Sequence, residues 1–144
     1  MALGEPDSDT SADEYGPISR PRPKRNDAEH RLQRDCARYL KLALPSDVYF
    51  TGVDHAGARS TFAGTLMKAR GIKPGQADLR LILPPTGRAL EVEIKTPKGV
   101  QSDRQREAEE AVTAAGGLYR IVRSVPELDA LLRSLGVPLR CNPL

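Results

Sequence analysis

The centre of the chain holds two runs, residues 77–83 and 88–95, in which apolar and charged side chains alternate. Because successive side chains of a strand point to opposite faces, each run predicts a β-strand with one apolar face and one charged face. Residues 84–87 (Pro-Pro-Thr-Gly) are typical of a short loop, so the two strands are expected to form an antiparallel hairpin. The apolar face would carry Ala77, Leu79, Leu81, Leu83, Leu90, Val92 and Ile94, and the charged face Asp78, Arg80, Glu91, Glu93 and Lys95.

The register of this hairpin decides which charges meet. With residues 84–87 as the loop, Arg80 faces Glu91 and Asp78 faces Glu93. Directly opposed residues have Cβ atoms about 4.5–5.5 Å apart, so the first pair is attractive and the second repulsive. Two facing carboxylates are usually explained by a shared proton or by a cation between them. The alternative is an ordinary solvated sheet face with alternating acids and bases, and the pattern alone leaves both open.

Helices and further strands are predicted on both sides of the hairpin from apolar spacing and from capping residues. The expected order is α-β-β-β-α-β-α, a mixed α/β sheet with helices on it. The predicted elements are a helix capped by Asn26 or Asp27 and ending near Leu42, a strand over 47–53, a long basic loop over 54–71 with a helical turn in 60–69, a helix over 102–115, a strand over 118–123 and a helix from Ser124 to Gly136.

Two capping boxes are expected, one in Ser102 to Gln105 and one formed by Ser124 and Glu127. The last helix carries a leucine stripe, which we interpret as core, with a dimer face as the alternative. The stripe consists of Leu128, Leu131, Leu132 and Leu135.

Length and composition indicate one globular domain. The chain has 144 residues and a formal net charge of +3, which permits nucleic-acid binding without requiring it. We expect residues 1–25 to be a disordered tail, 26–137 the domain and 138–144 a C-terminal tail; the basic end of the first tail is alternatively an arm that grips phosphates. No membrane span is expected, and Cys36 and Cys141 are interpreted as free thiols of a cytoplasmic protein.

Two polar residues outside the hairpin have more than one interpretation. Glu29 shares the inward stripe of the first helix, where a buried acid needs a partner, but a first-turn Glu is also favoured by the helix dipole. Gln105 is fully explained by its capping box. Neither pattern by itself assigns chemistry to these side chains.

The ordered motifs resemble the PD-(D/E)XK nuclease superfamily and, more narrowly, the VRR-NUC domain of virus-type replication-repair nucleases. The resemblance rests on Gly75-x-x-Asp78, Glu93-x-Lys95, Gln105 in the next helix, and the flanking segments 95–99 and 116–124. It covers about residues 26–137. The family commonly has Pro before the motif Asp, where this chain has Ala77.

This resemblance implies a metal-dependent DNA endonuclease with a restriction-endonuclease-like α/β fold. Asp78, Glu93 and the backbone carbonyl of Ile94 would hold Mg²⁺, for which Mn²⁺ would substitute, because hard cations prefer oxygen ligands. Glu29 would complete the outer part of the metal site. Lys95 would stabilise the phosphate or position the attacking water, and Gln105 would orient water or phosphate.

The resemblance also implies a substrate and an assembly state. Branched DNA such as a four-way junction, cut by a homodimer, is the expectation, with a sequence-specific restriction-type endonuclease or a non-catalytic DNA-binding subunit as alternatives. Basic residues around the hairpin are expected to contact the phosphate backbone. These are Arg59, Lys68, Arg70, Lys73 and Lys98.

Overall fold

A four-stranded mixed sheet forms the centre of the computed structural model, which describes residues 24–53 and 61–143. The strand order is β1-β2-β3-β4; β1 with β2 and β2 with β3 are antiparallel, whereas β3 and β4 are parallel. The strands are β1 Tyr49–Gly52, β2 Leu79–Leu83, β3 Arg88–Ile94 and β4 Leu118–Val122. The helices are α1 Lys24–Ala43, α2 Thr61–Ala69, α3 Asp103–Ala114 and α4 Val125–Ser134. The predicted mixed α/β architecture is confirmed.

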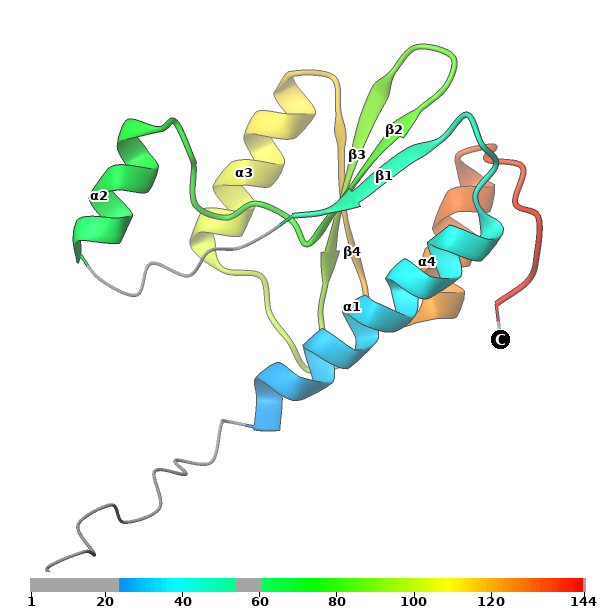
Figure 1. The fold of residues 1–144 in the computed structure, drawn as a ribbon, viewed down its shortest axis with the longest axis horizontal. Helices are drawn as coiled ribbons and strands as arrows, with labels where there is room; N and C mark the ends of the chain where they lie inside the picture. Colours follow the sequence, from blue (N-terminus) through cyan, green and yellow to red (C-terminus); the bar gives the residue numbers. More distant parts are fainter. Residues whose placement is uncertain (1–23, 54–60, 144) are drawn as a thin grey trace, which may run out of the picture.

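Helices cover the sheet on both sides (Figure 1): α1 and α4 pack together on one side, and α3 lies on the other. The apolar face of the hairpin meets α1 and α4, and the core forms there. This core includes Cys36, Leu40, Leu79, Leu81, Leu90, Val92, Ile94, Val122, Leu128 and Leu132, each 1% exposed or less. Leu131 and Leu135 pack against the same core while partly exposed. The leucine stripe of α4 therefore belongs to the core, as expected.

The predicted hairpin register is confirmed over β2 and β3. Arg80 pairs with Glu91, and the guanidinium Nε lies 2.5 Å from Glu91 Oε1. The solvated-face alternative is wrong, because Glu91 and Glu93 are only 4% and 3% exposed. Covering by α3 explains this burial, since a helix on the second face removes both carboxylates from water.

Most element boundaries differ from the sequence prediction by one or two residues, as at β2, which begins at Leu79 and not at Ala77. Helix α1 begins at Lys24, so Asn26 and Asp27 lie inside it and do not cap it; Asp27 instead sits in the first turn, where the helix dipole favours an acid. Strand β1 covers only residues 49–52 of the predicted 47–53, the four residues that pair with β2. The helical turn expected within 60–69 is the nine-residue helix α2.

The two predicted capping boxes have different outcomes. Ser102 and Gln105 form a complete box at α3. At α4, the Ser124 side chain accepts from the Glu127 N–H as expected, but the Glu127 carboxylate accepts from the N–H of Arg123 and not from that of Ser124. The prediction of a second capping box is therefore wrong for the hydrogen bond that the Glu127 side chain accepts.

The segment after α4 packs back onto the domain. The Arg140 N–H donates to Ala43 O at 2.8 Å, and Leu139 and Cys141 lie against the core. Both cysteines are free thiols, and burial raises the pKa of Cys36 to about 11. None of the helices described has the length and apolar character that a bilayer crossing requires. Residues 1–23 of the predicted tail and Arg59 lie outside the described residues.

Candidate active site

Glu93, near the end of β3, is the centre of a polar cluster on the α3 side of the sheet. Its Oε1 atom lies 2.8 Å from the Lys95 ammonium nitrogen and accepts a hydrogen bond from Gln105 Nε2 at 2.5 Å. Its Oε2 atom accepts from the Tyr119 hydroxyl at 3.5 Å. Because Glu93 and Lys95 are two apart on one strand, their side chains emerge on the same face. The predicted Glu-x-Lys pair is thus a contact in the structure.

Asp78 lies directly before β2, one position beyond the last hydrogen-bonded pair of the hairpin, Leu79 with Val92. The Ile94 N–H donates to Asp78 Oδ2 at 2.7 Å, so the backbone of β3 holds this carboxylate. Gln33 of α1 donates to the Asp78 carbonyl at 3.3 Å. The carboxylates of Asp78 and Glu93 therefore have separate donors within one site.

Gln105 makes two contacts at once, one within the predicted capping box and one to Glu93. Its Oε1 accepts from the Ser102 N–H at 2.8 Å, which closes the capping box, while its Nε2 donates to Glu93. A side-chain amide has one acceptor and one donor group, so both contacts are made at once. The helix cap thereby orients the amide toward the carboxylate.

Gly75 allows the loop before β2 to lie against the first turn of α3. Its φ of +83° belongs to the left-handed region, and a Cβ atom there would overlap the backbone carbonyl of Arg104. The Gly-x-x-Asp spacing therefore has a packing reason. It brings Asp78 within reach of the helix that carries Gln105.

Glu29, Asp78 and Glu93 line a common cavity, called the carboxylate hollow here, between α1, the sheet and α3. One part, of about 190 Å³, lies against α1. A second, of about 390 Å³, reaches Lys95, Arg104 and Gln105. The expected inward orientation of Glu29 is therefore confirmed, and all five predicted catalytic residues lie around one hollow.

Tyr119 is a residue of this site that the sequence analysis did not single out. Its side chain is 1% exposed, and burial, followed by the negative charges of Glu93 and Asp78, raises its pKa well above the ordinary value of 10.0. The phenol therefore stays protonated and donates to Glu93. Its place after Gly116-Gly117 on the strand parallel to β3 was the available signal.

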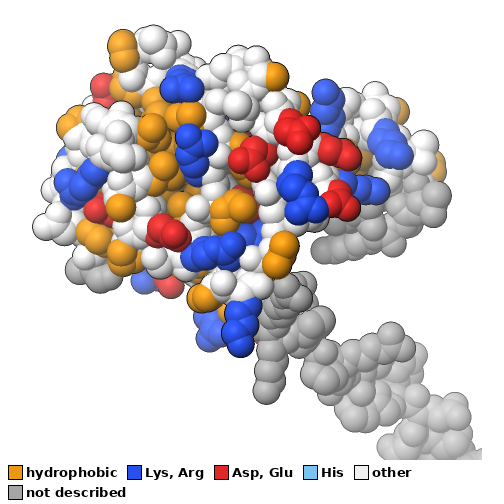
Figure 2. All heavy atoms as spheres, turned by 180° about the vertical axis from the view of Figure 1, so that it is seen from behind, with side chains coloured by type: hydrophobic (Ala, Val, Ile, Leu, Met, Phe, Trp, Pro, Cys, Tyr) orange, Lys and Arg blue, Asp and Glu red, His pale blue; other side chains and the backbone are white. Residues whose placement is uncertain are grey.

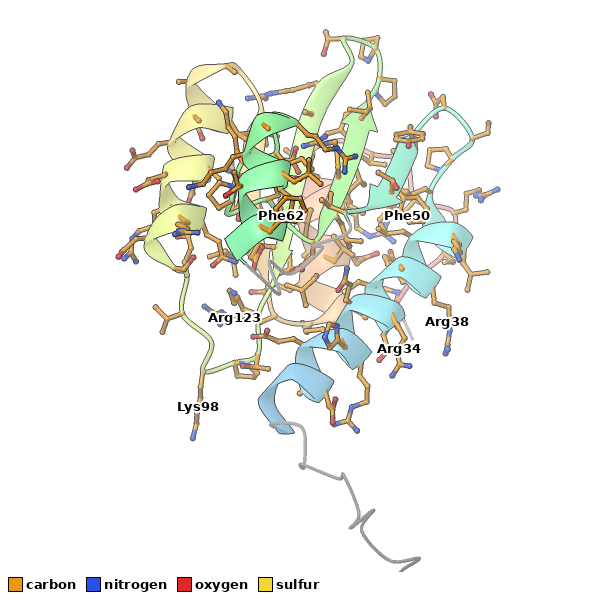
Figure 3. All side chains as sticks on the ribbon, turned by 60° about the vertical axis from the view of Figure 1, so that its left-hand side comes forward. Arg34, Arg38, Phe50, Phe62, Lys98 and Arg123 are labelled. Atoms are coloured by element: carbon orange, nitrogen blue, oxygen red, sulfur yellow. The ribbon has the colours of Figure 1, made fainter. Side chains whose placement is uncertain are left out.

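Arg123 is a second such residue, and it fixes the loop that follows Lys95. Its Nη1 donates to the carbonyls of Thr96 at 2.5 Å and Gly99 at 2.9 Å. In Figure 3 its partly buried side chain lies beside the 95–102 loop. This clamp holds the backbone on the C-terminal side of the Glu-x-Lys pair.

The donor set fits a hard cation with few protein ligands. Within residues 24–53 and 61–143, no three or more His, Cys, Asp or Glu side chains are gathered closely enough to hold an ion together. Mg²⁺ usually keeps several waters and takes only one or two carboxylates. Asp78 and Glu93 would supply that number, with Glu29 lining the part of the hollow against α1.

The predicted DNA contacts are dispersed. Lys68, Arg70, Lys73 and Lys98 are all exposed, and Figure 3 shows Lys98 projecting away from the body of the molecule. Lys73 lines a separate cavity of about 580 Å³ between α3 and the loop before β2. These four residues do not gather around the carboxylate hollow.

Comparison with known proteins identifies the fold. No family model matches the sequence, and neither does any curated protein. A solved structure described as a VRR_NUC domain protein has a TM-score of 0.58 and 17% identity, over 73% of this chain and 84% of that chain. Another, described as a VRR_NUC domain, has a TM-score of 0.48 and 23% identity, over 74% and 95%.

Proposed function

We propose that this chain, which has a VRR-NUC-like fold, is a metal-dependent DNA nuclease that hydrolyses phosphodiester bonds at the carboxylate hollow. The observation that carries the proposal is the buried Glu93, held by Lys95 and Gln105, with Asp78 and Glu29 lining the same hollow. A buried carboxylate is costly unless it is hydrogen-bonded and paired. Two more acids beside it favour a site for chemistry over a structural ion pair.

Phosphodiester hydrolysis defines what these residues do. When bound, Mg²⁺ neutralises charge on the phosphate and lowers the pKa of a coordinated water. Asp78 and Glu93 would hold the ion, together with the backbone carbonyl of Ile94, and Glu29 would hydrogen-bond its outer waters. Lys95 places a positive charge where negative charge develops on the phosphate oxygens. Gln105 and Tyr119 fix the direction of the Glu93 carboxylate by donating to its two oxygens.

The finer proposal is that the substrate is branched DNA, such as a four-way junction, and that the active species is a homodimer. It is supported by the resemblance of the Gly75 to Gln105 motifs to VRR-NUC nucleases. Two sites related by a two-fold axis suit the symmetry of a junction. Light scattering with and without a junction tests the assembly, and a strict monomer in both states would overturn this part.

The experiment that tests the activity is a cleavage assay on labelled four-way junction, flap and linear duplex, each with Mg²⁺, Mn²⁺ or EDTA. We expect cutting of the branched substrates with either metal and none with EDTA. Asp78→Ala, Glu93→Ala and Lys95→Ala should each lower the rate by at least about 10³-fold, because each removes a group from the charged site. Circular dichroism of each variant checks that the fold is kept.

Each outcome separates the alternatives. Cutting of linear duplex at a fixed sequence would keep the site but replace junction selectivity with restriction-type activity. Binding of DNA without cleavage under any metal would favour a non-catalytic DNA-binding subunit. Full activity in a folded Glu93→Ala protein would overturn the assignment of the site.

A further inference from the structure

The carboxylate hollow continues into a second cavity, of about 630 Å³, between α1 and the edge strand β1. We call this cavity the α1–β1 groove. His30 and Gln33 line both it and the part of the hollow that contains Asp78 and Glu93, so the two spaces adjoin. Gln33 also donates to the Asp78 carbonyl at 3.3 Å, which fixes α1 against the site at this junction.

Gly52 keeps this groove open. Gly52 pairs with Leu79, whose side chain enters the core below α1. Directly paired residues place their side chains on one face of a sheet, so a side chain at position 52 would also point toward α1. A Cβ atom there would meet only the Asp78 carbonyl oxygen, at 4.0 Å. The absence of a side chain at position 52 therefore leaves open space between β1 and α1.

The groove is lined by positive charge. Arg31 and Arg34 line it against one acid, Asp27, which gives two guanidinium groups to one carboxylate. Neither guanidinium forms an ion pair or hydrogen bond with another described residue. Exposed guanidinium groups without protein partners suit phosphate oxygens, which they bind through two parallel N–H bonds.

Helix α3, on the other face of the sheet, carries a net negative charge. Figure 2 shows acidic side chains gathered over α3 on the face seen from behind. Helix α3 carries four acids, Asp103, Glu107, Glu109 and Glu110, and two bases, Arg104 and Arg106, so its net charge is −2. Because a polyanion avoids such a surface, a strand that reaches Glu93 would approach from the α1 side.

We propose that the α1–β1 groove holds the DNA strand next to the scissile phosphate, with Arg31 and Arg34 contacting its backbone. This inference rests on the proposed nuclease function and names the path of the substrate through the site. The volume of the groove lies within the range of about 300–1,000 Å³ that ligand pockets occupy. The groove accepts the flanking nucleotides on one side of the cut, since it adjoins the hollow at one end.

Three variants test the groove against a matched control. Arg31→Ala and Arg34→Ala each remove one phosphate contact, and Gly52→Val fills the groove with a side chain that a strand tolerates. Arg38→Ala is the control, since Arg38 lies on the exposed side of α1 one turn beyond Arg34 (Figure 3) and lines a different cavity, near Cys141. Binding of a labelled four-way junction is followed by fluorescence anisotropy in EDTA over a salt series, and cleavage is followed in Mg²⁺.

We expect each arginine variant to weaken binding about tenfold and to reduce the salt slope by about 0.7–0.9, the value of one phosphate contact. Gly52→Val should raise KM at unchanged thermal stability, and Arg38→Ala should match the wild type in every measurement. Removing nucleotides from one side of the mapped cut should weaken binding, whereas removing them from the other side should not. With the DNA shortened on the sensitive side, Arg34→Ala should bind as weakly as the wild type does, because the contact is already lost.

The outcomes distinguish this inference from the function on which it rests. If the wild type cleaves and the two arginine variants and Gly52→Val equal it, the groove is not the path, and the nuclease function stands. If the wild type binds DNA without cleaving and Arg34→Ala still weakens binding, the groove stands and the nuclease function falls. Equal losses in Arg34→Ala and Arg38→Ala would indicate general charge attraction and overturn the inference.

Discussion

At the scale of single residues, the site depends on side chains that make two contacts at once. Gln105 caps α3 through Oε1 and holds Glu93 through Nε2. Ser102 takes part in the same capping box and does not contact Glu93 in the hydrogen bonds of the site. Comparing substitutions of Gln105 and Ser102 therefore separates the stability of the helix from the chemistry at the Glu93 carboxylate.

Gln105→Ala and Ser102→Ala should both lower the free energy of unfolding by about 1 kcal/mol, because each removes a bond of the capping box. Only Gln105→Ala should also lower kcat, by at least about tenfold, since Glu93 loses a donor. Urea denaturation and cleavage rates on one junction substrate measure the two effects. A similar loss of kcat in Ser102→Ala would mean that the cap, and not the contact to Glu93, supports activity.

At the scale of elements, the loop before β2 and the first turn of α3 are placed by a close backbone contact at Gly75. Gly87, in the hairpin loop, has a similar positive φ of +73°, but a Cβ atom added there would meet nothing within 4 Å beyond its chain neighbours. Both glycines have a positive φ, but only at Gly75 would an added Cβ atom overlap another backbone segment. Comparing them isolates the contribution of packing between the loop and α3.

Gly87→Ala should destabilise the protein by about 1 kcal/mol through backbone strain alone. Gly75→Ala should cost at least about 2 kcal/mol, because the new methyl group also displaces the Arg104 carbonyl. Gly75→Ala should in addition lose cleavage, since the loop that carries Asp78 moves away from Gln105. Urea midpoints and kcat decide between these expectations; equal midpoints for both variants would contradict the close contact.

At the scale of the whole molecule, a polar cluster joins the two helices that cover the core. The Tyr39 hydroxyl of α1 donates to Asp129 Oδ1 of α4, and Arg133 Nε donates to Asp129 Oδ2 at 2.9 Å. These hydrogen bonds, first that from Arg133 and then that from Tyr39, lower the pKa of Asp129 below its ordinary value of 3.8. The cluster thus makes the packing of α1 on α4 depend on an ionised carboxylate.

The sign of the pH effect follows from this lowered pKa. The unfolded chain binds the Asp129 proton at a higher pH than the folded chain does, so the contribution is complete above pH 3.8 and is lost as the pH falls through the folded pKa. Asp129→Asn should be less stable than the wild type at pH 7, and this gap should shrink as the pH falls below about 4. Urea titrations of both proteins from pH 7 downward test it; a gap that is independent of pH would contradict the ionised carboxylate.

Local pattern was sufficient for the hairpin and its register. Alternation fixed which residues of 77–83 and 88–95 share a face, and the four-residue loop fixed the pairing of Arg80 with Glu91. The hairpin pattern placed Asp78, Glu93 and Lys95 on one charged face, and the resemblance to VRR-NUC nucleases singled them out as site residues. The prediction of the second capping box was wrong because the Glu127 carboxylate accepts from the N–H of Arg123 and not from that of the adjacent Ser124. The sequence pattern does not distinguish between these two neighbouring donors.

The five proposed site residues were named by the resemblance of the motifs to VRR-NUC nucleases. Sequence by itself determined the mixed sheet, the faces of its strands and the leucine core of α4. These depend on periodicity and short separations, which are properties of neighbouring residues. Only the tertiary structure decided that Glu93 is buried, that Glu29 and Tyr119 join it, and that Gly52 leaves a groove beside α1. These depend on contacts between segments far apart in the chain, such as α1 with the residue before β2, and no local pattern encodes such distances.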